Sequence, residues 1–293
     1  MVISLAFFAG FLGAVIVNLI ELIERYRDED KCRKTLEELR WPEGIECPRC
    51  REHNISPIEK RGQHHCLSCG YHFSVTVGTI FHDTHLPLWK WFITVYMMVE
   101  SRKGVSANQI KRTLGVGYKT AWYLCHRIRA AMAELNAEQL NGTVEVDETL
   151  VGGKVRGKGR GFKGNKAIVV GAIQRDGKVR LKVIEGTDKK TLHKFIREHT
   201  ADDTELIITD EWPAYKGIGD HNTKHETVNH SEEEWVRGDV HTNTIEGVWS
   251  LLNRSVIGTF HKISAKHLDA YLDELEWRFN NRKNPYLLRV SQS

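Results

Sequence analysis

The stretch Thr-Val-Glu-Val-Asp-Glu, at Thr143–Glu148, decides how the second half of the chain folds. Its β-branched residues predict a buried strand, and an acidic residue, Asp147, follows the run. A second apolar run, Leu206–Thr209, is followed in the same way by Asp210. Two strands that each end in a carboxylate can bring those carboxylates together.

A third carboxylate, Glu246, belongs to a helical pattern. One face of the predicted helix is apolar and carries Ile245, Val248, Trp249 and Leu252. The other face is polar and carries Asn243, Glu246, Ser250 and Asn253. Carboxylates from two strands and one helix can converge on two hard divalent cations, because Mg²⁺ prefers oxygen ligands and needs few from the protein. Such a pair of ions can hold the attacking and leaving oxygens of a phosphoryl displacement. The simpler alternative is that Asp147 and Asp210 are turn residues or helix caps.

Length and composition bound the class of protein. At 293 residues and 41% hydrophobic content the chain has room for two globular domains, and its net charge of +4 is mildly basic. Basic residues interleaved with glycine gather between Lys154 and Lys166, namely Lys154, Arg156, Lys158, Arg160, Lys163 and Lys166. Such a cluster contacts phosphates or forms a solvated loop.

Four of the six cysteines form two Cys-x-x-Cys pairs, and Cys32 and Cys125 stand alone. The paired residues are Cys47, Cys50, Cys66 and Cys69, with 15 residues between the pairs. This spacing predicts one structural, tetrahedral Zn²⁺ rather than redox pairs, and a reducing cytosol rather than secretion. Since four thiolates fill the shell, we expect the nearby histidines to be on the surface or to face phosphates; they are His53, His64, His65 and His72.

The first half otherwise has a helical pattern. One helix is predicted over Asn18–Arg40, ending at Trp41-Pro42, and a second, core-forming helix over Leu86–Arg102. Ser106 can cap a third helix, Gly115 supplies a turn, and Tyr118–Met132 forms a fourth. This order is typical of a DNA-binding helix-turn-helix, although an ordinary helical hairpin has the same pattern. The candidate DNA contacts on its second helix are Lys119, His126, Arg127 and Arg129.

From Val144 onward, strands predominate. They are predicted over residues 144–151, 167–175, 179–185, 206–209 and 226–229, with a hairpin turn at Asp176-Gly177. Helices are predicted over residues 191–199, 243–259 and 264–281. This alternation predicts an α/β mixed sheet, and an α+β multidomain protein overall.

Several long motifs resemble one family. They include Val146–Lys154, Thr209–Tyr215, Val228–His230 and His241–Ser250, together with the cysteine pairs and Arg278–Arg282. These residues resemble bacterial and archaeal insertion-sequence transposases that have an N-terminal zinc ribbon and a DDE catalytic domain.

The resemblance implies an RNase H-like fold for the second half, with Asp147, Asp210 and Glu246 as the Mg²⁺ or Mn²⁺ ligands. Some relatives use an amide as third ligand, which makes Asn243 the alternative to Glu246. Relatives often have a basic residue seven positions after the acidic one, where this chain has Asn253. Contact with the element end is then expected to be weaker or to shift to Arg254.

The expected domains are 18–82 for the N-terminal helix and zinc ribbon, 83–140 for the helical DNA-binding region, and 141–285 for the catalytic domain. Residues 1–17 form an apolar extension in which Val2–Val17 carry no charge. It could be a membrane anchor, slightly short of the roughly 20 residues that a span needs, a buried helix, or sequence translated upstream of the true start. We favour the last.

We therefore expect a cytoplasmic, nucleoid-associated DNA transposase. It would bind the ends of its element and target DNA as a homo-oligomer, and it would act on no small molecule. One alternative is a catalytically inactive DNA-binding regulator, and another is a simple Mg²⁺-dependent nuclease of the same fold.

Overall fold

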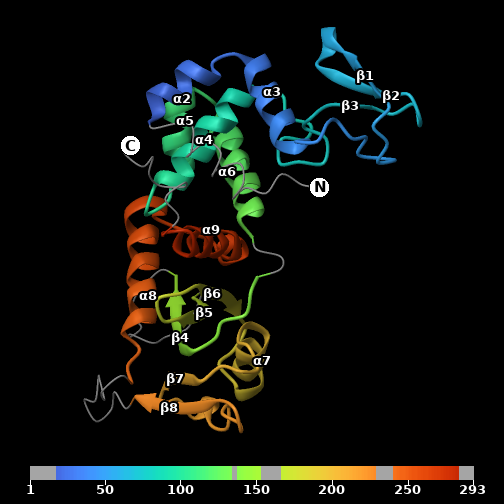
Figure 1. The fold of residues 1–293 in the computed structure, drawn as a ribbon. Coiled ribbons are helices and arrows are strands. Elements are labelled where there is room, and N and C mark those ends of the chain that lie inside the picture. The colour runs from blue at the N-terminus through green and yellow to red at the C-terminus, as the bar shows by residue number, and fades with distance from the viewer. Residues whose placement is uncertain (1–17, 134–136, 153–165, 229–239, 284–293) are drawn as a thin grey trace, which may run out of the picture. The chain divides into compact units, whose positions relative to one another are not determined.

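The computed structural model describes residues 18–133, 137–152, 166–228 and 240–283 (Figure 1). The chain forms two compact units, Met1–Met132 with Arg282–Ser293 and Ala133–Asn281. In the described ranges, no helix is long and apolar enough to cross a membrane. The apolar extension at residues 1–17 and the basic cluster between Lys154 and Lys166 lie outside the described residues, apart from Lys166.

The described part of the first unit begins with two helices, α2 (Leu19–Tyr26) and α3 (Glu29–Arg40), so the prediction of one continuous helix is wrong. The break has a local cause. Asp28 adopts an extended backbone, and its side chain accepts a hydrogen bond from the amide of Asp30 at 2.8 Å, so it starts a new helix. The predicted end of α3 before Trp41-Pro42 is confirmed.

The four paired cysteines belong to a small three-stranded antiparallel sheet in the order β1-β2-β3. Its strands are β1 (Ile55–Ile58), β2 (Gln63–Cys66) and β3 (His72–Phe73). The buried core of this ribbon is only Cys47, Cys66 and Phe73, with a few partly buried apolar neighbours. So small a core gives little hydrophobic stabilisation, which is why such ribbons depend on a metal.

Three further helices complete the described part of the first unit: α4 (Leu88–Glu100), α5 (Ala107–Leu114) and α6 (Tyr118–Met132). The predicted elements of the helix-turn-helix are confirmed. Ser106 caps α5 by accepting from the amide of Gln109, and Gly115 ends it in the left-handed region at φ 62°. The prediction that this helix forms core is confirmed, since Trp91, Phe92, Val95 and Met98 of α4 are buried.

The second unit is built on a five-stranded mixed sheet in the order β6-β5-β4-β7-β8. The strands are β4 (Thr143–Val151), β5 (Ala167–Gln174), β6 (Val179–Ile184), β7 (Leu206–Asp210) and β8 (Lys224–Val228). The first three are antiparallel neighbours, whereas β7 and β8 run parallel to β4. Each predicted strand is therefore present, within about two residues of its expected bounds, in the mixed sheet of an RNase H-like α/β domain.

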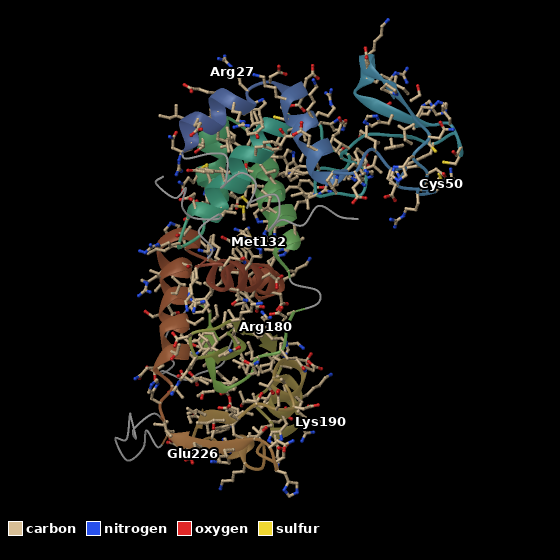
Figure 2. All side chains as sticks on the ribbon, viewed as in Figure 1. Arg27, Cys50, Met132, Arg180, Lys190 and Glu226 are labelled. Carbon is tan, nitrogen blue, oxygen red and sulfur yellow. The ribbon has the colours of Figure 1, made fainter. Side chains whose placement is uncertain are left out.

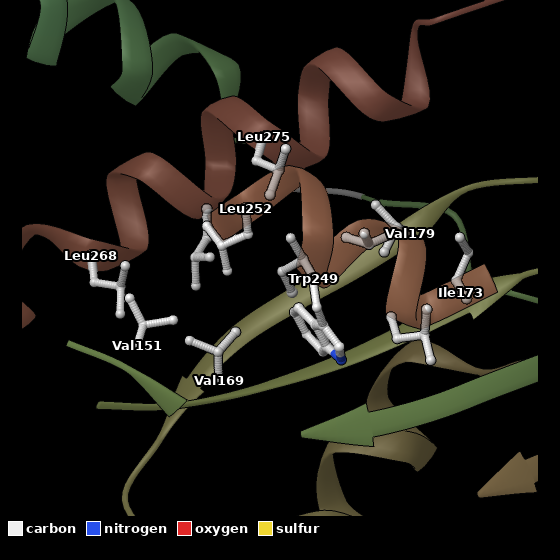
Figure 3. Close-up of a cluster of buried hydrophobic side chains, with 12 residues drawn as sticks. Val151, Val169, Ile173, Val179, Trp249, Leu252, Leu268 and Leu275 are labelled. Atoms are coloured by element: carbon white, nitrogen blue, oxygen red, sulfur yellow. The ribbon is translucent and has the colours of Figure 1, made fainter. Parts of the chain in front are cut away.

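Helices cover both faces of this sheet. On one face, Leu192, Phe195 and Ile196 of α7 (Lys189–His199) pack on Val144 and Val146. On the other face, α8 (Asn243–Ser255) and α9 (Leu268–Asn280) cover β5 and β6. Figure 3 shows this second core, in which Trp249 and Leu252 of α8 point toward Val169 and Ile173 of the sheet. The predicted helix over residues 243–259 changes at Val256, where a π-helical turn, Val256–Phe260, replaces the last α-helical turn.

Candidate functional site

The four paired cysteines converge. Their sulfur atoms all lie within 4.8 Å of one another, and the Sγ–Sγ distances are 3.5 Å for Cys50–Cys66 and 3.7 Å for Cys47–Cys69. Figure 2 shows Cys50 in the ribbon. Four soft thiolates at this spacing fit a tetrahedral Zn²⁺.

The histidines beside this cluster do not share one role. His64 is buried, and its Nε2 lies 2.8 Å from Oε1 of Glu37 on α3, so the expectation of a surface or phosphate-facing side chain is wrong for this residue. His65 and His72 form a ring contact at 4.5 Å across β2 and β3, and His53 is exposed. Pairing with a helix carboxylate explains the burial of His64, since a buried imidazole needs a partner.

Asp147 is the middle residue of β4, so it does not close its strand as expected from the β-branched run, whereas Asp210 is the last residue of the adjacent parallel strand β7. The β4–β7 ladder pairs Thr143 with Leu206 and Glu145 with Ile208. Continuing the same register by two residues brings Asp147 level with Asp210. Side chains at matched positions of neighbouring strands point to the same face, and such strands lie about 4.8 Å apart. The parallel register therefore brings the two carboxylates close to each other on one face of the sheet.

The pKa of the Asp147 carboxyl group is raised well above its usual value. Burial, together with the negative charges of Asp210 and Glu246, raises the pKa of Asp147 to about 6, although a hydrogen bond from Trp249 acts in the opposite direction. The indole Nε1 of Trp249 donates to Oδ2 of Asp147 at 2.8 Å. The three acidic side chains thus repel one another, and a bound divalent cation would offset that repulsion.

Asn243 and Glu246 are both exposed near the start of α8, where Asn243 is the first residue of the helix and Glu246 lies three residues later. Thr242 donates from Oγ1 to Oε1 of Glu246 at 3.3 Å. On β7, the amide of Trp212 donates to Oδ1 of Asp210 at 3.0 Å. In the described part of the chain only the four cysteines gather their ligand atoms within 4.8 Å, so the three carboxylates are spaced more widely.

Trp249 reaches Asp147 because the sheet leaves room for its ring. Gly171 pairs with Asp147 across β4 and β5. A Cβ atom at Gly171 would lie 2.6 Å from Cη2 of Trp249 and 3.0 Å from Cδ1 of Ile245. Only glycine therefore permits this close approach of α8 to β5.

Two further acidic residues of β4 were not predicted as part of the site. Glu148 faces Tyr215, whose hydroxyl donates to Oε2, and burial raises the pKa of Glu148 to about 7. Glu145 is fully buried and contacts the start of α8. Strand alternation could have identified Glu145, because residues two apart on a strand share a face and Asp147 is two positions on.

The candidate DNA contacts differ in exposure. Lys119 and Arg254 are exposed, and Arg254 donates to Oγ of Ser250 at 2.8 Å. Arg127 donates to the carbonyls of His82 at 2.8 Å and Thr79 at 3.3 Å. Arg129 is 1% exposed. We therefore do not retain Arg129 as a candidate DNA contact.

The remaining candidate DNA contacts are His126 and four residues of the basic cluster. His126 is half-buried, with its ring 4.0 Å from that of Trp122. Lys154, Arg156, Lys158 and Arg160 lie outside the described residues.

The two regions of the chain that carry these sites each match a family of known proteins. Residues 139–280 match the model of the ISXO2-like transposase domain, and residues 27–72 match a transposase zinc-ribbon domain. A "transposase-like protein" of Haemophilus influenzae is 31% identical over 104 residues, 36% of this chain and 82% of that protein. The chain belongs to this family of insertion-sequence transposases.

A second relative matches over most of both chains. The protein is in transposable element ISH50 of Halobacterium salinarum, and it is 27% identical over 279 residues, 87% of this chain and 92% of that protein. Among solved structures, a chain of the simian T-cell lymphotropic virus intasome complex with PP2A regulatory subunit B56 gamma aligns over 62% of the transposase with 13% identity and a TM-score of 0.31. A score this low does not establish a shared fold.

Proposed function

We propose that this transposase binds the ends of its mobile element, cleaves the DNA there by metal-assisted hydrolysis, and joins the freed 3′-OH to target DNA. The proposal rests above all on the register of β4 and β7, which brings Asp147 and Asp210 level. Glu246 on α8 acts electrostatically on the same Asp147. A nuclease, a polymerase and a transposase can share such a site, and the family match favours the transposase.

The donor set fits Mg²⁺ or Mn²⁺. Asp147, Asp210 and Glu246 would hold two ions through carboxylate oxygens, with the remaining positions left to water and DNA phosphate oxygens. When bound, the ions supply charge stabilisation at the attacking and leaving oxygens. The cluster of Cys47, Cys50, Cys66 and Cys69 would hold one Zn²⁺ that stabilises the ribbon and takes no part in the reaction.

The chemistry needs no covalent intermediate with the protein. In the first step water attacks a phosphodiester, the P–O3′ bond breaks, and a 3′-OH is released. In the second step that 3′-OH attacks a target phosphodiester, a new P–O bond forms, and a target 3′-OH leaves. The protein's part is to position the DNA strand and the carboxylates, while Asn243 orients DNA or water from the first turn of α8.

DNA would be held by several regions of the chain. Lys119 on α6 and Arg254 on α8 are exposed cations that can neutralise phosphates. We also assign phosphate contact to the basic cluster of Lys154, Arg156, Lys158 and Arg160. Assembly of a homo-oligomer on the two element ends is part of the same proposal.

A strand-joining assay separates this function from its two alternatives. The purified protein is incubated with labelled element-end DNA, a supercoiled target plasmid and Mg²⁺ or Mn²⁺, with Asp210→Asn as the matched control. We expect cleaved ends and covalent end–plasmid products with the wild type and neither with the variant. Cleavage without joined products would show a nuclease, and tight binding without cleavage would show a regulator.

A further inference from the structure

One carboxylate beside the proposed site is buried completely. Glu145 lies on β4 two residues before Asp147 and is 0% exposed. An uncompensated carboxylate in such a place is costly, so its partners must offset the loss of hydration. Arg175 supplies the balancing charge, with Nε 2.9 Å from Oε1 of Glu145.

The imidazole Nδ1 of His241, just before α8, lies 3.4 Å from Oε1 of Glu145, and the hydrogen-bond donors other than Arg175 come from the start of α8. The amides of Thr244 and Ile245 donate to Oε2 at 2.8 Å and 3.1 Å. The hydroxyl of Thr244 donates to Oε1 at 2.8 Å. First-turn amides have no partner within their own helix, so Glu145 caps α8 from a strand about 100 residues earlier in the chain.

The usual local cap is absent from this helix. Thr242 is the N-cap residue, yet its side chain makes no capping hydrogen bond. Its hydroxyl donates to Glu246 instead. A local cap would satisfy the amides of α8 wherever the helix lay, whereas a cap from β4 also fixes the helix against the sheet. Arg175 adds to this by donating from Nη2 to the carbonyl of His241 at 3.2 Å, just before the helix.

Glu246 therefore lies between two attachments of α8 to β4. The first is Glu145 with Thr244 and Ile245, and the second is Asp147 with Trp249. We infer that Glu145 is a positioning residue, which sets where Glu246 and Asn243 stand relative to Asp147 and so determines the affinity of the carboxylate site for divalent cations. This inference rests on the proposed function of that site.

The test uses Glu145→Gln in the full chain, which keeps the side-chain shape and removes the charge. Glu274→Gln is the matched control, because Glu274 is also a buried carboxylate in the second unit, at 1% exposure, and α9 carries none of the proposed ligands. Three quantities are measured: Mn²⁺ affinity by calorimetry without DNA, hydrogen exchange of peptides covering Thr244 and Ile245, and the melting temperature.

We expect Glu145→Gln to weaken Mn²⁺ binding by roughly 10- to 100-fold, the usual effect of removing a group that orients metal ligands. Exchange at Thr244 and Ile245 should become faster, while Glu274→Gln keeps the wild-type affinity. Wild-type Mn²⁺ affinity in Glu145→Gln, or equal loss in Glu274→Gln, would overturn the inference.

If Glu145→Gln does not fold, Thr244→Val decides the question. This change removes one of the hydrogen bonds to Glu145 and preserves its charge and its pairing with Arg175, so a several-fold loss of Mn²⁺ affinity is expected and an unchanged affinity overturns the inference. The calorimetry is independent of transposition. A wild-type protein that neither cleaves nor joins DNA would refute the proposed function, while the Mn²⁺ titrations would still test Glu145.

Discussion

The two candidate metal sites of this transposase are built in opposite ways. All four sulfur ligands come from a single ribbon, and they converge within 4.8 Å. The three carboxylates come from β4, β7 and α8, and they converge less closely. A closed cluster of thiolates holds a structural ion, whereas an open set of carboxylates leaves positions for substrate oxygens. The compact cysteine site is therefore suited to stabilising the ribbon, and the open carboxylate site is suited to catalysis.

The comparison predicts that the largest effect on folding follows from breaking the cysteine site. Cys50→Ser should abolish zinc binding and unfold residues 45–75, while the second unit stays folded. Structural Zn²⁺ contributes about 10–16 kcal/mol in small zinc domains, more than this ribbon can replace by burial. Metal analysis and limited proteolysis measure the two effects.

Cys125→Ala is the control for that experiment, because Cys125 is buried on α6 and lies outside the four-sulfur cluster. It should retain one zinc per chain. Full zinc content in Cys50→Ser would show that the four sulfurs do not form one site.

A second change acts on the carboxylate site through packing. Gly171→Ala places a Cβ 2.6 Å from Cη2 of Trp249, so the indole must move away from Asp147. Overpacking of this kind costs about 1–3 kcal/mol of unfolding free energy. Chemical denaturation of the second unit measures it.

The same substitution on α8 itself provides the contrast with Gly171 of β5. Gly247 has open space around its Cβ position, so Gly247→Ala should stabilise the helix by roughly 0.5–1 kcal/mol. Equal stability changes in the two variants would show that Gly171 does not govern the placement of Trp249.

A third prediction separates support of the fold from DNA contact. Arg127 donates to two carbonyls inside the first unit, so Arg127→Ala should lower the free energy of unfolding by about 1.5–3 kcal/mol. Any weakening of DNA binding should be the same for element ends and for random DNA. Lys119 is exposed, and Lys119→Ala should instead reduce the slope of log affinity against log salt by about 1. A loss at Arg127 that is confined to element ends would make this residue a base-reading contact.

The smallest expected effect concerns a half-buried carboxylate outside the site, that of Asp273. Burial, together with the negative charge of Asp269, raises the pKa of Asp273 on α9 to about 6. Because the folded pKa exceeds the unfolded one, the carboxyl favours folding below about pH 4, and that contribution is lost as the pH rises to about 6. Asp273→Asn should therefore be more stable than the wild type by about 1 kcal/mol at pH 7 and not at pH 4.

Thermal unfolding at the two pH values tests the Asp273 prediction, and an Asp273→Asn protein that is less stable at pH 7 would contradict it. The comparison with Asp147 is informative, since both acids have a pKa of about 6. Asp147 differs from Asp273 in its neighbours, because Asp210 lies beside it on β7, Glu246 acts on it from α8, and the indole of Trp249 donates a hydrogen bond to it. A raised pKa without such neighbours does not identify a site.

The sequence predicts much of this fold because the deciding signals are local. Two cysteine pairs at a fixed gap predict their own cluster, and Ser106 with Gly115 predicts the bounds of α5. The strands follow from their β-branched runs. The break at Asp28 was missed because its capping geometry is also compatible with a position inside a longer polar helix.

The carboxylate site could be predicted only as a set of candidates. The level placement of Asp147 and Asp210 depends on which strands pair and in what register, and that is set by the whole sheet. The roles of Glu145, Gly171 and Trp249 depend on how α8 packs on β4 and β5. Burial of Arg129 and His64 likewise arises from tertiary packing, which an isolated helix or strand pattern does not specify.

The central claim is that Asp147, Asp210 and Glu246 form one divalent-cation site. Calorimetric titration of Mn²⁺ into the wild type and into Asp147→Asn, Asp210→Asn, Glu246→Gln and Asn243→Ala tests it most directly, with cleavage assayed on the same samples. We expect each carboxylate variant to lose Mn²⁺ binding and to lower cleavage by on the order of 10³-fold while binding DNA normally, and Asn243→Ala to keep its metal with a partial defect. Normal Mn²⁺ binding and cleavage in Glu246→Gln, with an inactive Asn243→Ala, would contradict the choice of third ligand, and wild-type behaviour of all four variants would contradict the site itself.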